Sequence, residues 1–96
     1  MATIPSQFQD AYNVNRFGVA SGTASATQFP SQECKMVRFK ADPDNNEDFL
    51  LGVEGNTSFP LDAGDDTGWV SASNLNQFYY SNVSGSAEYL YYWWQL

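Results

Sequence analysis

The residues most able to bind a cation lie in one acidic loop. Asp42, Asp44, Asn46 and Asp48 alternate as the first ligands of a calcium-binding loop do. Glu47 stands where such a loop needs glycine for its sharp turn, and Val53 stands where a chelating glutamate is expected. The pattern favours a solvated loop over a weak cation site, and we predict no metal ion and no cofactor.

The side chains that most often serve as catalytic base and nucleophile are scarce in this sequence. The sequence has no histidine and a single cysteine, Cys34, so neither a Ser–His nor a Cys–His pair can form. Two carboxylates suffice for glycoside hydrolysis, but among 11 acidic residues in 96 some pair will lie close by chance. We therefore predict that the protein is not an enzyme and has no catalytic residues.

The C-terminal segment 88–96 is apolar on both sides. As a strand it places Leu90, Tyr92 and Trp94 on one face and Tyr89, Tyr91 and Trp93 on the other. Each aromatic side chain buries about 150–250 Å² when packed, so three left in water would reach or exceed the largest apolar patch of a typical monomer. We therefore expect other residues of the chain, or another molecule, to cover one aromatic face of this strand.

Two alternatives remain for what covers these rings. In the first, the N-terminal arm folds back and packs Phe8, Tyr12 or Phe17 on the outer rings. In the second, another subunit, a partner surface or a sugar ring covers them, because Tyr and Trp are enriched at the centres of interfaces. We name Phe8, Tyr12, Phe17, Tyr89, Tyr91 and Trp93 as candidate interface residues.

The elements that would carry these residues are short strands. Apolar residues gather in runs of about five, separated by Gly, Asn, Asp and Pro, and none recurs at helical spacing. Within 35–41, Val37, Phe39 and Ala41 alternate with polar neighbours, which predicts one buried and one wet face. We predict a hairpin from this strand and the next one, 49–53.

The whole pattern predicts a single all-β domain. Residues 1–15 are expected to form an extended N-terminal arm, and residues 16–96 an antiparallel β-sandwich of jelly-roll type. Further strands are expected at 16–20, 23–28, 59–61, 69–72, 76–81 and 88–95. The formal net charge of −7 makes nucleic acids and membrane surfaces poor partners. No secretion signal is visible near Met1, so we expect synthesis in a cytoplasm.

The order of these segments resembles small virion proteins of tailed bacteriophages. The likeness runs from about residue 22 to 94 and rests on Gly22-Thr23-Ala24, 35–41, Gly52-Val53, 59–64 and 74–79. It is greatest to capsid decoration, or cement, proteins, although Tyr91, Trp93 and Trp94 make this ending unusually aromatic.

The resemblance implies a structural role. It implies a β-sandwich on the outer surface of a capsid, with the major capsid protein as partner and a homo-oligomer, a trimer favoured. The alternative is a carbohydrate- or receptor-binding module of a phage fibre or tail, with Trp69, Tyr79 or Trp93 as a stacking platform.

Overall fold

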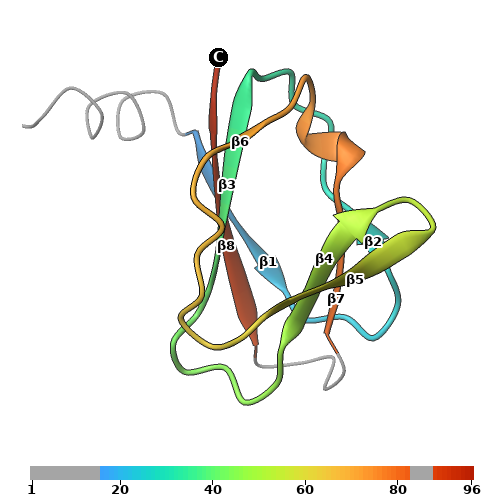
Figure 1. The fold of residues 1–96 in the computed structure, drawn as a ribbon, viewed down its shortest axis with the longest axis vertical. Coiled ribbons are helices and arrows are strands. Elements are labelled where there is room, and N and C mark those ends of the chain that lie inside the picture. Colours follow the sequence, from blue (N-terminus) through green and yellow to red (C-terminus); the bar gives the residue numbers. More distant parts are fainter. Residues whose placement is uncertain (1–15, 83–87) are drawn as a thin grey trace, which may run out of the picture.

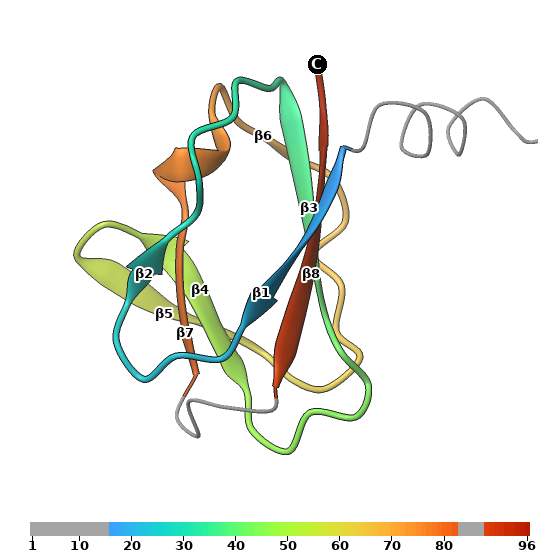
Figure 2. The same ribbon diagram turned by 180° about the vertical axis from the view of Figure 1, so that it is seen from behind.

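The described part of the chain forms two antiparallel four-stranded sheets packed face to face. The computed structural model describes residues 16–82 and 88–96. Sheet A holds, in spatial order, β1 (Phe17–Ser21), β8 (Tyr89–Gln95), β3 (Met36–Ala41) and β6 (Val70–Ser71). Sheet B holds β2 (Thr27–Gln28), β7 (Tyr79–Asn82), β4 (Phe49–Val53) and β5 (Asn56–Leu61). Figures 1 and 2 show the two layers from opposite sides.

The connections give the strand order of a jelly roll. The chain passes from one sheet to the other at every connection except β4 to β5, which forms a hairpin within sheet B. This order is that of an eight-stranded double-sheet jelly roll, which confirms the predicted fold class. The predicted arm, 1–15, with Phe8 and Tyr12, lies outside the described residues.

The predicted hairpin between 35–41 and 49–53 is wrong. These strands are β3 and β4, and they belong to different sheets, so the 42–48 loop crosses between the layers. The hairpin is formed instead by β4 and β5, where Gly55 supplies the positive φ of 78° that a tight turn needs. A tight turn specifies a hairpin, whereas a long polar loop does not.

The core lies between the sheets and is largely aromatic. Val37, Phe39 and Ala41 of β3 are buried, while Met36, Arg38 and Lys40 point outward, as the alternation predicts. Phe29 joins the layers, because its ring centroid lies 5.1 Å from those of Phe39 and Tyr92 and 4.6 Å from that of Tyr80. The other buried apolar residues are Ala20, Cys34, Phe49, Leu51, Leu61, Leu75 and Leu90.

The position of β8 in sheet A explains why the C-terminal segment is apolar on both faces. It lies between β1 and β3 in the middle of sheet A, so its inner residues reach the core. Leu90 is fully buried, and Tyr92 and Trp94 pack against the core. Tyr89, Tyr91 and Trp93 therefore lie on the outer face.

Several predicted strands have different bounds, and the expected 23–28 strand is reduced to β2, Thr27–Gln28. The expected 59–61 strand begins earlier, at Asn56. The expected 76–81 strand starts only at Tyr79, because Leu75–Gln77 form a single 3-10 turn, η1. The Asn74 side chain accepts a hydrogen bond from Asn76 N–H, and Gln77 caps the turn in return.

Candidate functional site

The outer face of sheet A carries one continuous apolar surface. The strand register places Phe17, Trp93 and Arg38 in one row across β1, β8 and β3. The next row holds Val19, Tyr91 and Lys40. We call the apolar members of this face the aromatic strip, which consists of Phe17, Val19, Tyr89, Tyr91 and Trp93.

The strip is partly covered by its own members and remains open to solvent. The ring centroid of Phe17 lies 5.3 Å from that of Trp93 and 6.2 Å from that of Tyr91. These contacts leave Tyr91 and Trp93 half-buried. Phe17, Val19 and Tyr89 are still 44%, 48% and 43% exposed. The described residues therefore do not provide the cover that the sequence requires.

A cationic border runs along one side of the strip. The guanidinium of Arg38 lies over the Trp93 ring, 5.7 Å from its centroid, and makes an ion pair with Asp66. The hydrogen bond from Arg38 lowers the pKa of the Asp66 carboxyl. The four basic residues of the chain all lie on sheet A or directly before its strands, and they are Arg16, Lys35, Arg38 and Lys40. Sheet A therefore concentrates the positive charge of an acidic protein.

A carboxylate continues this β3 border just beyond the end of the strand. The Tyr91 hydroxyl donates a hydrogen bond to Asp42 Oδ2, and the backbone N–H of Asp44 donates to Asp42 Oδ1. The Tyr91 hydrogen bond lowers the pKa of Asp42 and raises that of Tyr91. Asp42, the first residue of the calcium-like pattern, thus holds an aromatic ring in place.

The acidic loop is held by residues that the loop pattern does not reveal. The buried Glu88 carboxylate accepts the backbone N–H groups of Asn46, at 2.9 Å, and Glu47, at 2.7 Å. The Asn45 side chain exchanges two hydrogen bonds of 2.9 Å with the backbone of Tyr89. Within 16–82 and 88–96, no group of three or more His, Cys, Asp or Glu residues is placed to hold a metal ion.

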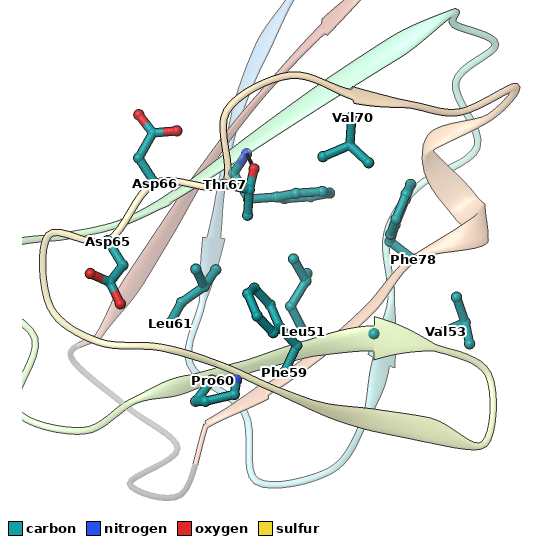
Figure 3. A pocket seen from close by; sticks show the side chains of 12 residues that line it. Leu51, Val53, Phe59, Pro60, Leu61, Asp65, Asp66, Thr67, Val70 and Phe78 are labelled. Atoms are coloured by element: carbon teal, nitrogen blue, oxygen red, sulfur yellow. Dashed lines mark hydrogen bonds between the residues drawn. The ribbon is translucent and has the colours of Figure 1, made fainter.

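A second apolar surface is a groove between the free edges of β5 and β6. The groove has a volume of about 480 Å³, and its lining includes the buried residues Phe39, Leu51 and Leu61. Figure 3 shows Leu51 and Leu61 among the side chains that line it. Phe59, which is 58% exposed, lines its rim. Its polar members are Asp65, Asp66 and Thr67, whose hydroxyl is already bonded to backbone groups of Phe39 and Gly68.

Cys34 offers no reactive thiol in this structure. It is buried, it donates to the carbonyl of Ala72 at 3.7 Å, and burial raises its pKa. A thiol with a raised pKa carries little of the nucleophilic thiolate at neutral pH.

Four of the six predicted interface residues come together on one face. These are Phe17, Tyr89, Tyr91 and Trp93, while Phe8 and Tyr12 lie outside the described residues. The sequence reasoning missed Val19, which alternates with Phe17 along β1 and gave a usable signal. It also missed Arg38 as a cover for Trp93 and Phe59 as a groove residue, because both depend on the pairing of distant strands.

Comparison of the chain with protein-family models, curated proteins and solved structures gave no significant match. In the described ranges, no helix has the length and hydrophobicity to cross a bilayer. The exposed surfaces of the jelly roll are therefore the features that bear on function.

Proposed function

We propose that the protein is a structural virion protein that docks on the outer surface of a phage capsid through the aromatic strip and stabilises the shell. The observation that carries this proposal is the strip itself, whose members Phe17, Val19 and Tyr89 stay exposed in a small acidic domain. Jelly rolls recur in viral capsid domains, which makes the fold suitable for this role. The host cytoplasm is the proposed site of synthesis.

The composition of the strip suits a protein partner. Tyr and Trp supply large contact areas at low entropic cost and dominate the energetic centres of interfaces. The border of Arg38 and Lys40 suits an acidic patch on the capsid protein, since complementary charge speeds encounter and fixes register. The overall charge of −7 disfavours nucleic acid and membrane partners.

The polar groups around the strip support a role without chemistry. Asp42 is bonded to Tyr91, and Asp66 is paired with Arg38. Each carboxylate thereby orients a side chain of the strip or of its border, and neither is left free to act as an acid or base. We propose that binding alone is the function.

The carbohydrate-binding alternative is favoured by the fold, because lectins also use jelly rolls. A sugar ring needs an open aromatic face. The face of Trp93 is instead shared with Phe17 and Arg38, whereas Trp69 is 40% exposed. Specific binding of the protein to immobilised glycans, abolished by Trp69→Ala, would support this alternative over capsid docking.

Capsid attachment tests the proposal directly. Tyr89→Ser and Lys40→Glu change the strip and its border without altering β1. We expect each to weaken binding to capsids prepared without this protein by about tenfold or more, the size of an interface hot spot. The matched control is Phe59→Ser, which removes an exposed ring from the groove. Loss of attachment by the control alone would place docking in the groove and contradict the proposal.

A further inference from the structure

The free edge of β1 differs from the other sheet edges. Proteins protect exposed edges with short strands, proline, charge or bulges. β2 and β6 contain two residues each. β5 contains Pro60, and its register with β4 shifts at Leu51/Gly52. β1 has five residues, Phe-Gly-Val-Ala-Ser, with no proline, no charge and no register shift.

The hydrogen bonds at the two ends of β1 show which of its backbone groups face the open edge of the sheet. Trp94 N–H donates to the carbonyl of Arg16 at 3.3 Å, and Gly22 N–H donates to that of Glu88 at 2.8 Å. Bonding alternates along an antiparallel pair, so the even-numbered residues of β1 bond to β8. Phe17, Val19 and Ser21 therefore direct their N–H and C=O groups to the open edge, where no described residue pairs with them.

We propose that this edge binds β1 of a second copy of the chain in antiparallel orientation. A two-fold axis at Val19 pairs it with Val19 of the partner subunit and pairs Phe17 with Ser21 of the partner subunit. Each of these pairs exchanges both N–H···O=C bonds, so every outward-directed group of β1 is satisfied. A two-fold contact of identical surfaces is the commonest arrangement in homo-oligomers.

The absence of charge on β1 favours contact between two copies along this strand. Two copies of net charge −7 repel each other. β1 has no charged side chain, so the strands meet without placing carboxylates face to face. Pairing also joins two copies of sheet A into one sheet with both aromatic strips on the same side.

The contact is small. A pair of five-residue strands buries less than the roughly 1,000 Å² of a stable interface, so we expect a weak dimer that depends on protein concentration. Salt should strengthen it, because screening reduces the repulsion between the copies.

Sedimentation or light scattering on the full chain across the micromolar range tests the inference. We expect the mass to double with concentration. Val19→Pro removes an outward N–H that β1–β8 pairing does not use, so it should leave a folded monomer. Val19→Thr keeps the N–H and should dimerise like the parent. A monomer at every concentration, or a trimer unaffected by Val19→Pro, overturns the proposal.

Amide hydrogen exchange on the unaltered protein gives a test that needs no variant. Protection of Phe17, Val19 and Ser21 should rise with concentration, while Gly18 and Ala20 stay protected throughout. Protection of all five at high dilution would mean that the same chain covers the edge, and it would exclude the second copy. The inference is independent of capsid docking, because Tyr89→Ser and Lys40→Glu leave this edge unchanged.

Discussion

A single buried carboxylate organises the loop at the end of the sandwich. Glu88 is 2% exposed and accepts the N–H groups of Asn46 and Glu47. Hydrogen bonds to a charged group are stronger than neutral ones, and their loss leaves buried donors unsatisfied. Glu88 thus ties the acidic loop to the start of β8, beside the aromatic strip.

Glu88→Ala should lower the free energy of unfolding by about 2–3 kcal/mol, because two backbone donors lose their acceptor. Urea denaturation measures the loss. Glu88→Gln keeps one acceptor oxygen and should cost less, and the exposed Glu54→Ala should change stability by less than about 0.5 kcal/mol. Equal losses for Glu88→Ala and Glu54→Ala would show that the carboxylate does not hold the loop.

The Arg38–Asp66 pair gives a dependence on pH. The hydrogen bond from Arg38 lowers the pKa of the Asp66 carboxyl in the folded protein. Asp66 therefore stabilises the fold at pH values above its unfolded-state pKa of about 3.9, and this stabilisation is lost as the pH falls through its folded-state pKa. Asp66→Asn should therefore reduce stability near neutral pH by less than about 1 kcal/mol, since both groups are partly exposed. Urea midpoints at several pH values should show the difference from the parent closing in acid. A difference that persists there contradicts this assignment.

At the scale of elements, the close packing of β8 against β1 depends on Gly18, which has no side chain. A Cβ on Gly18 would lie 2.3 Å from Tyr92 Cζ, because the ring of Tyr92 lies over β1. Gly18→Ala should destabilise the fold by about 1–3 kcal/mol through overpacking. Thermal unfolding measures this, with Ser21→Ala on the exposed face as the control. Combining Gly18→Ala with Tyr92→Leu should recover part of the loss, and no recovery would exclude the contact as its cause.

The individual strands were more predictable from sequence than their partners. The alternation in 35–41 and the two apolar faces of 88–95 are local patterns, and the structure confirms both. The β3–β4 hairpin was wrong, because a loop such as 42–48 does not specify whether the next strand stays in the same sheet. Of the candidate site, the aromatic rings were predictable from β8 itself. Arg38 over Trp93 and the groove residues were not, since they depend on register between strands distant in sequence.

At the scale of the molecule, the two sheets differ in character. Sheet A presents the aromatic strip with Arg38 and Lys40 on its outer face, and the groove with Phe59 at its rim lies between the edges of β5 and β6. A domain with two such surfaces suits a protein that is held between neighbours. In the proposed account, the strip provides docking and the edge of β1 provides self-association.

Hydroxyl-radical footprinting with and without capsids tests docking by the strip most directly. Aromatic side chains react readily when exposed, so their loss of reactivity marks the covered face. The account predicts that Tyr89, Tyr91 and Trp93 become protected on attachment, while Phe59 and Trp69 react as they do in the free protein. Protection of Phe59 and Trp69 with an unchanged strip would contradict it.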